Sequence, residues 1–119
     1  MAGFSDTAKD STLTTLVGSY TWISLHTADP GNTGANEVPT GVYARIQTTW
    51  GTVGSPTQDA VTGSTVVVTV PASTTVTYWG LWTASTSGTW CTGGQLPAPF
   101  STGGSSGTYS GTPTLNAAG

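Results

Sequence analysis

Short segments of β-branched and aromatic residues, separated by glycine and proline, dominate this chain of 119 residues. The clearest segment, residues 64–70, has the sequence STVVVTV and is followed by Pro71. β-Branched side chains favour strands, and proline cannot donate to a sheet ladder. The connections are too short for the crossovers that a parallel sheet needs. The pattern therefore predicts an all-β fold, namely an antiparallel β-sandwich or small barrel of about six to eight short strands.

Other segments carry weaker forms of the same signal. One short N-terminal helix is expected over residues 6–17, with Gly18 as its end. Further strands are expected over residues 20–27, 42–50, 74–84 and 89–92 and in the tail 108–117, with an edge-type segment over 95–100. Loops without regular structure are expected over 28–41, 51–63 and 103–107. Large apolar residues on both faces of 20–27 indicate a central strand. Gly80, between two tryptophans, indicates a bulge or the close approach of another group.

The chain is almost uncharged, which limits its partners. Only 6% of residues are charged, against about 25% in a typical soluble domain, whereas there are 26 threonines and 13 serines. Two cations and a net charge of −3 cannot neutralise a run of phosphates, so nucleic-acid binding is not expected. No apolar run is long enough to span a bilayer, and the N-terminus lacks the pattern of a signal peptide.

Length and composition together predict one β-rich domain over residues 1–119, with residues 1–5 and 117–119 flexible. A hydrated but weakly repulsive surface suits a subunit that packs against copies of itself or a larger assembly. The single cysteine, Cys91, excludes an internal disulfide framework and a thiolate zinc cluster. With no basic neighbour in the sequence, it is interpreted as an inert buried thiol.

Catalysis is not predicted, because acid–base groups are few. The only histidine, His26, precedes Asp29 by three residues and could pair with that carboxylate or with Glu37 to bind a metal or to act with a hydroxyl. We favour a structural histidine that caps a strand or bonds a turn, and an Asx-type turn at Asp29 before Pro30-Gly31. The carboxylates beyond the N-terminal segment, Asp59 among them, lie among turn residues. No enzyme activity, cofactor or metal is therefore expected.

Arg45 and the aromatic residues are the remaining candidates. Arg45, in the middle of a predicted strand, is interpreted as an ion pair or carbonyl clamp that holds the 28–41 loop to the sheet, with a subunit contact as the alternative. Trp79 and Trp82, like Trp22, are expected in the core or an interface. Trp50 and Trp90, near strand ends, are candidates for surface platforms that bind sugar, as is Tyr109.

Three blocks of sequence carry a resemblance to a known group of proteins. They are SLHTADPGNTGANEV at 24–38, YARIQTTWG at 43–51, and VTYWGLWTASTSGT at 76–89, followed by a late Leu-x-x-Pro at 96–99. Together these blocks resemble small accessory virion proteins of tailed bacteriophages, of the tail fibre, minor tail or head-decoration type found in phages of actinobacteria. The resemblance covers about residues 20–100. It implies a non-enzymatic structural role in the virion, and residues 24–31 and 43–45 would be a structural signature of the fold.

The predicted function is therefore that of a structural subunit on a tailed-phage particle, assembled in the host cytoplasm. Its partners would be copies of itself, as a trimer or another symmetric oligomer, and the major capsid or tail proteins. Head and tail locations both stay open. The alternative from another class is a carbohydrate-binding module that attaches to a host surface glycan.

Overall fold

The computed structural model describes residues 5–54 and 60–116. Flexibility was predicted for residues 1–5 and 117–119, of which 1–4 and 117–119 lie outside this part of the chain, as does Asp59, for which a loop position was predicted. The described residues form one helix and eight strands, in the order α1 (Asp6–Ser19), β1 (Trp22–His26), β2 (Ile46–Gln47), β3 (Ala60–Thr62), β4 (Val66–Val70), β5 (Thr75–Trp82), β6 (Trp90–Ser101), β7 (Gly107–Gly111) and β8 (Thr114–Asn116).

Helix α1 begins at a serine cap and tolerates several threonines. The Ser5 side chain accepts a hydrogen bond from Ala8 N at 3.2 Å, which satisfies one free amide of the first turn. Three threonine hydroxyls donate to the carbonyl four residues earlier, so these side chains add no unpaired polar group to the helix. Leu13 is fully buried. The helix continues through Gly18, where we had expected it to end, and stops at Ser19.

The larger layer is an antiparallel sheet with strand order β2-β1-β5-β6. Strand β1 lies inside this sheet, and four of its five residues are buried, which confirms the prediction of a central strand. One face of β1 carries Ile23 and Leu25, and the opposite face carries Ser24 and His26. The first pair packs in the apolar core, and the second pair belongs to a buried polar cluster described below.

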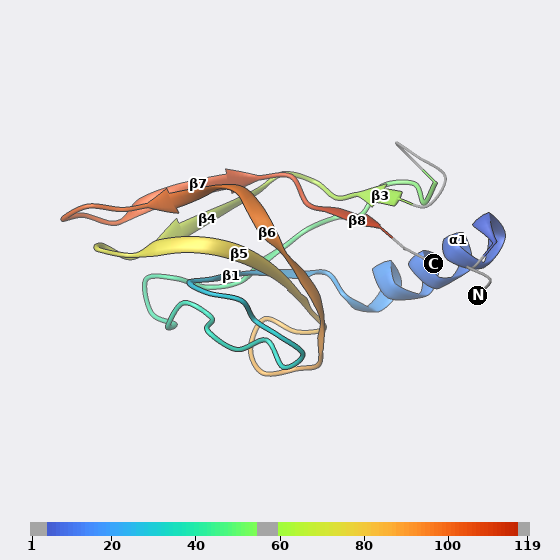
Figure 1. The fold of residues 1–119 in the computed structure, drawn as a ribbon, viewed down its shortest axis with the longest axis horizontal. Coiled ribbons are helices and arrows are strands. Elements are labelled where there is room, and N and C mark those ends of the chain that lie inside the picture. The colour runs from blue at the N-terminus through green and yellow to red at the C-terminus, as the bar shows by residue number, and fades with distance from the viewer. Residues whose placement is uncertain (1–4, 55–59, 117–119) are drawn as a thin grey trace.

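Strands β4 and β7 pair with each other and form the opposing layer (Figure 1). Val66, Val68 and Val70 of β4 are buried in the core, whereas Val67 is 54% exposed. Burial therefore alternates along β4, because successive side chains of a strand point to opposite faces of the sheet. In Figure 1, β6 runs from the layer of β5 up to the layer of β7. The described sheets do not join into a closed barrel, so the fold is sandwich-like.

A third pair of strands, β3 and β8, lies beside α1 at one end of the molecule (Figure 1). Val61 and Leu115 lie opposite each other in this pair, and both are buried. We had expected a loop over residues 51–63 and one strand in the tail. The loop expectation is wrong for residues 60–62, because β3 becomes a strand by pairing with β8, more than fifty residues later in the sequence. The tail holds β7 and β8 where one strand was expected.

The strand expected over residues 42–50 is also wrong, except for the two residues of β2. The flanking residues Tyr43 and Trp50 form isolated bridges with Thr40 and Gly63. Tyr43 and Arg45 are buried because their side chains take part in polar contacts with a neighbouring loop, and strand alternation does not continue through them. Conversely, the segments expected separately at 89–92 and 95–100 form the single edge strand β6.

Candidate functional site

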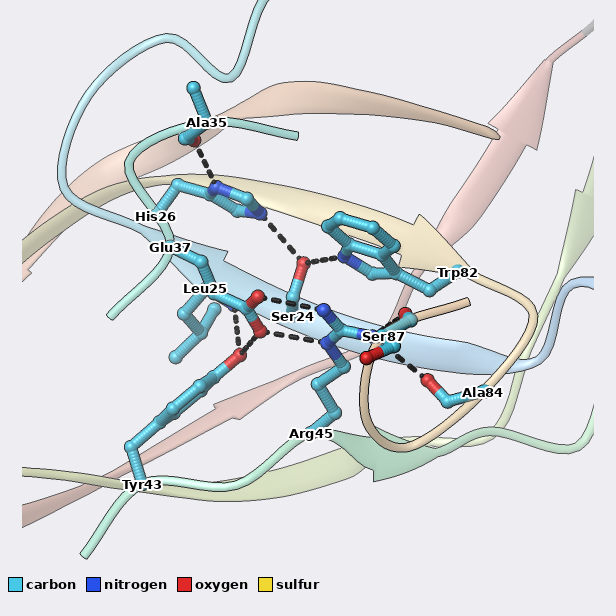
Figure 2. Close-up of polar contacts among 10 residues, drawn as sticks. All are labelled: Ser24, Leu25, His26, Ala35, Glu37, Tyr43, Arg45, Trp82, Ala84 and Ser87. Atoms are coloured by element: carbon cyan, nitrogen blue, oxygen red, sulfur yellow. Dashed lines mark hydrogen bonds and ion pairs between the residues drawn. The ribbon is translucent and has the colours of Figure 1, made fainter. Parts of the chain in front are cut away.

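The polar side chains that the sequence analysis singled out gather on one face of β1 (Figure 2). We call this group the β1 polar cluster, and it consists of Ser24, His26, Glu37, Tyr43, Arg45 and Trp82. Strand β1 supplies the serine and the histidine, and β5 supplies the tryptophan. The other three residues come from the irregular segment between β1 and β2. The cluster therefore joins the central strands of the sheet to the long loop that covers them.

Ser24 and His26 form a hydrogen-bonded pair with one defined proton arrangement. His26 Nδ1 lies 2.7 Å from the carbonyl oxygen of Ala35, which can only accept, so Nδ1 carries the hydrogen. In the neutral ring Nε2 then accepts, and the Ser24 hydroxyl donates to it at 2.7 Å. Ser24 Oγ in turn accepts from Trp82 Nε1 at 2.9 Å. Every side-chain nitrogen and oxygen atom of Ser24 and His26 therefore takes part in a hydrogen bond.

A serine bonded to a histidine is also the arrangement of a nucleophile and its base, but this pair has no access to a substrate. Both side chains have zero exposure to solvent. The ring is oriented by a backbone carbonyl, whereas in hydrolases a carboxylate stabilises the imidazolium that forms during the reaction. Burial lowers the pKa of His26, so the neutral ring is favoured. The geometry therefore holds the fold together and offers no route for attack on a bound molecule.

Gly80 is the residue of β5 that makes room for this pair. A Cβ atom at Gly80 would lie 2.4 Å from the Trp90 ring, 2.5 Å from Ser24 Oγ and 2.7 Å from His26 Nε2. All three distances are shorter than side chains tolerate. The close approach predicted for this glycine is confirmed, and the groups that approach are side chains.

Glu37 and Arg45 form the ionic half of the cluster. Arg45 Nε and Nη2 each lie 2.8 Å from one carboxylate oxygen, which is a bidentate pair, and only 7% and 19% of the Arg45 and Glu37 side chains are exposed. The Tyr43 hydroxyl donates to the same carboxylate at 2.7 Å and accepts from Leu25 N. Burial alone would raise the pKa of Glu37, but the hydrogen bonds from Arg45 and Tyr43 outweigh it and hold that pKa below its ordinary value. Burial and the bond to Glu37 raise the pKa of Tyr43.

The remaining contacts of Arg45 reach a second loop. Its Nη1 donates to the carbonyl oxygens of Ala84 at 3.0 Å and Ser87 at 2.8 Å, and the guanidinium lies 3.8 Å from the centre of the Trp82 ring. Figure 2 shows the guanidinium between the carboxylate of Glu37 and these carbonyls. Arg45 thus makes both the ion pair and the carbonyl clamp expected from the sequence. A role in a subunit contact stays a prediction.

Asp29 acts in the turn that follows β1. Its Oδ1 accepts a hydrogen bond from Gly31 N at 2.8 Å, and Gly31 has a positive φ of 60°. This is the Asx turn predicted before Pro30. Its carboxylate is exposed and does not reach His26 through any contact among residues 5–54 and 60–116. In the same part of the chain, no group of three or more histidine, cysteine, aspartate or glutamate side chains is placed to hold a metal.

The tryptophans divide between the cluster and the other side of the sheet. Trp82 is buried, and Trp90 packs edge-on against both Trp82 and His26 at 5.2 and 5.5 Å between ring centres. Trp50 is half-buried and donates its indole N–H to Tyr20 O at 2.7 Å. Trp90 and Trp50, the candidates for sugar platforms, are both half-buried and make these internal contacts, and their role in sugar binding stays a prediction.

Ser24 and Tyr43 entered the sequence analysis only within the signature ranges 24–31 and 43–45, and neither of them was assigned a contact in a site. Each lies two residues before a residue that was considered, but neither a serine nor a tyrosine in a β-rich segment is unusual. The alternation of β1 does place Ser24 on the same face as His26, and this was the available signal. Nothing in the sequence pointed to the pairing of Tyr43 with Glu37, because it depends on how the 28–41 loop folds back.

A groove lies on the opposite side of the sheet from the cluster. It has a volume of about 450 Å³ and is lined by residues from β1, β4, β5, β6, β7 and β8, including Ile23, Leu25, Val66, Trp79, Gln95, Leu96, Pro97 and Tyr109. It therefore lies between the layers of the sandwich. Trp79 and Tyr109 belong to the aromatic residues singled out from the sequence, and the groove brings them together.

Two further features bear on function. The Cys91 thiol is half-buried, whereas a buried thiol was expected. Burial raises the pKa of this thiol, which disfavours the reactive thiolate.

No helix within residues 5–54 and 60–116 has the length and apolar character that crossing a membrane requires.

Comparison with protein families gives a match over most of the chain. A family model described as "Podophage GP4 fiber I protein gp80" matches residues 7–109. The matched range begins in α1 and ends in β7, so it contains the whole β1 polar cluster and most of both layers. No curated protein matches the chain. The match agrees with the resemblance to tailed-phage virion proteins drawn from residues 24–99.

Proposed function

Since this chain belongs to the family of the podophage GP4 fiber I protein gp80, we propose that it is a non-enzymatic structural subunit of a phage fibre, held in the virion by symmetric contacts with its own copies and by contacts with other virion proteins. The observation that carries the proposal is the family match, which extends over most of the chain. A fibre subunit needs a rigid fold and surfaces that fit its neighbours, and it needs no reactive group.

The β1 polar cluster supports the non-enzymatic part of this proposal. Its histidine and serine are buried, the Glu37 side chain is 19% exposed, and each of the three is bonded to a protein group. The same contacts hold the loops before β2 and after β5 against the sheet. The chemistry of the cluster is therefore that of a clamp that fixes covering loops on a strand.

The surface supports assembly with copies of the same chain. The molecule is elongated, with extents of 49 × 25 × 25 Å. Exposed sheet edges are commonly protected by lysine or proline. Strand β6 carries Pro97 and Pro99, whereas β4 and β7 carry neither proline nor a charged residue. On the outer face of β4, Val67 is 54% exposed. We therefore place the subunit contact on the β4–β7 layer and expect a trimer.

The fibre assignment is tested on purified particles of the phage that encodes this chain. Quantitative mass spectrometry is expected to find the protein at the low copy number of a fibre, and immunogold labelling is expected on the fibres. Several hundred copies on the head would instead mean capsid decoration, and absence from the particles would refute a virion role.

Assembly is tested on the purified protein by native mass spectrometry. We expect a trimer that dissociates on Val67→Lys and persists on Val42→Lys, because Val42 is similarly exposed, at 59%, but lies outside the β4–β7 layer. A wild-type protein that stays monomeric at high micromolar concentration would contradict the proposed symmetric contact.

A carbohydrate-binding role is the second candidate, and one observation favours it. Tyr109, which the sequence analysis named as a sugar-binding aromatic, lines the groove between the layers together with Trp79. A structural fibre subunit can also carry such a site, so this role does not exclude the first.

A further inference from the structure

We propose that the groove between the layers is a binding site for a neutral saccharide, with Trp79, Gln95 and Tyr109 as the residues that contact it. The proposal deepens the second candidate function by naming the site and the ligand class. It is independent of where in the virion the subunit lies. The size of the groove fits a saccharide, since small-molecule sites have volumes of roughly 300–1,000 Å³ and this groove has a volume of about 450 Å³.

The charge of the groove determines the class of ligand. None of the lining residues within 5–54 and 60–116 is charged, and the two cations of the chain, Lys9 and Arg45, are not among them. A phosphorylated or acidic ligand would lose its hydration there without gaining a counter-charge. An uncharged ligand has no such cost, so the groove favours a neutral molecule.

The polar groups of the groove distinguish a saccharide from a purely apolar ligand. Among the described residues, the Gln95 amide and the Tyr109 hydroxyl have no protein hydrogen-bond partner. By contrast, the Thr112 hydroxyl at the same groove is already paired with that of Thr65 at 2.8 Å. An amide both donates and accepts, as does a phenol, and the hydroxyls of a sugar match both.

The aromatic rings supply the second half of saccharide recognition. A sugar ring has a face of C–H groups, and such a face packs on an aromatic ring while the hydroxyls around its edge form hydrogen bonds. Trp79 is half-buried and lies across Gly94, where a Cβ atom would come within 2.8 Å of its indole nitrogen. Tyr109 is held by an edge-on contact with Phe100. Both rings are thus fixed in place before a ligand binds, which lowers the entropic cost of binding.

An irregularity in β6 places the third residue. Between the pairs Tyr78–Gln95 and Val76–Phe100, strand β5 has one residue and β6 has four. The extra residues begin with Leu96 and Pro97, both of which line the groove with Gln95. Bulges of this kind redirect side chains, and they occur next to binding sites more often than elsewhere.

The test uses the full purified chain and a glycan array that contains neutral and acidic oligosaccharides, followed by titration of the strongest neutral ligand with tryptophan fluorescence. We expect binding to neutral structures and a change in the tryptophan emission of the chain on titration. Gln95→Ala and Tyr109→Phe should each weaken affinity about two- to tenfold, because each removes one set of hydrogen bonds. Trp79→Ala should reduce binding below detection.

Matched controls separate the site from general effects on the fold. Gln47→Ala and Tyr78→Phe make the same chemical changes at positions that do not line the groove, and both should bind as the wild type does. If Trp79→Ala does not fold, the two milder variants still decide the question.

Three results would overturn the proposal. One is the absence of any response to neutral saccharides, and another is binding that survives both Gln95→Ala and Tyr109→Phe. The third is loss of the oligomer on these substitutions, which would identify the groove as a contact between copies of the chain. The particle experiment above is unaffected by any of these outcomes, so the fibre assignment can stand if the saccharide site fails.

Discussion

The clamp formed by Arg45 permits a quantitative prediction about stability. Arg45→Met keeps much of the side-chain volume but removes the bidentate pair with Glu37 and the bonds to two carbonyl oxygens. Removal of one partner from a buried ion pair costs about 3–5 kcal/mol, since the other charge stays buried without compensation. The low exposure of both side chains places this pair in that class.

Thermal unfolding by calorimetry or circular dichroism measures this cost. An unfolding entropy of about 2 cal/mol/K per residue corresponds to about 4 °C for each kcal/mol in a chain of this length, so the midpoint of Arg45→Met should fall by roughly 12–20 °C. Glu37→Gln keeps the shape of the partner and removes its charge, and we expect it to cost about 1–3 kcal/mol.

The double variant tests whether the two residues act together. Arg45→Met with Glu37→Gln should be more stable than the sum of the two single effects predicts, by about 1–3 kcal/mol, because the uncompensated charge is gone. If Arg45→Met lowers the midpoint by less than about 4 °C, or if the two effects simply add, the ion pair does not hold the loops and the reasoning is refuted.

Other predictions concern packing, pH and thiol chemistry. Gly80→Ala should lower the free energy of unfolding by at least about 1–3 kcal/mol, because its Cβ would clash with three packed side chains. Gly18→Ala, at an open position of the helix, should leave that free energy unchanged or raise it slightly. Equal effects of the two variants in denaturant titrations would contradict this difference. The folded state lowers the pKa of His26 and of Glu37, so the unfolded chain binds more protons, and stability should fall with decreasing pH, first below about 6.5 and further below about 4.5. His26→Gln should remove the first part of this loss, and a profile unchanged by that variant would show that the ring does not contribute. Cys91 should react with a thiol reagent at neutral pH more slowly than a free cysteine peptide, and an equal rate would mean that burial does not disfavour its thiolate.

Local chemistry explains the parts of the site that the sequence predicted. The Asx turn at Asp29 depends on a side chain and an amide two residues apart, and the close approach at Gly80 is indicated by the only small residue between two tryptophans. The only arginine of the chain, once buried, needs a carboxylate and carbonyl groups as partners, and Arg45 has both. The resemblance to tailed-phage virion proteins was likewise carried by contiguous blocks, and the family match confirms it.

Long-range pairing explains the parts that the sequence did not predict. Strand β3 exists because β8 lies beside it, and the region around β2 is irregular because Tyr43 and Arg45 turn toward Glu37. The groove, too, is formed by residues far apart in the chain.

The sequence by itself determined a mostly β, antiparallel fold with one short helix, because strand propensity, face alternation and glycine–proline turns act over a few residues. The tertiary structure decided which strands pair, which polar side chains meet on β1, and which aromatic rings line the groove between the layers. Those outcomes depend on loop closure and on the fit between the two layers, and neither has a local signature in the sequence.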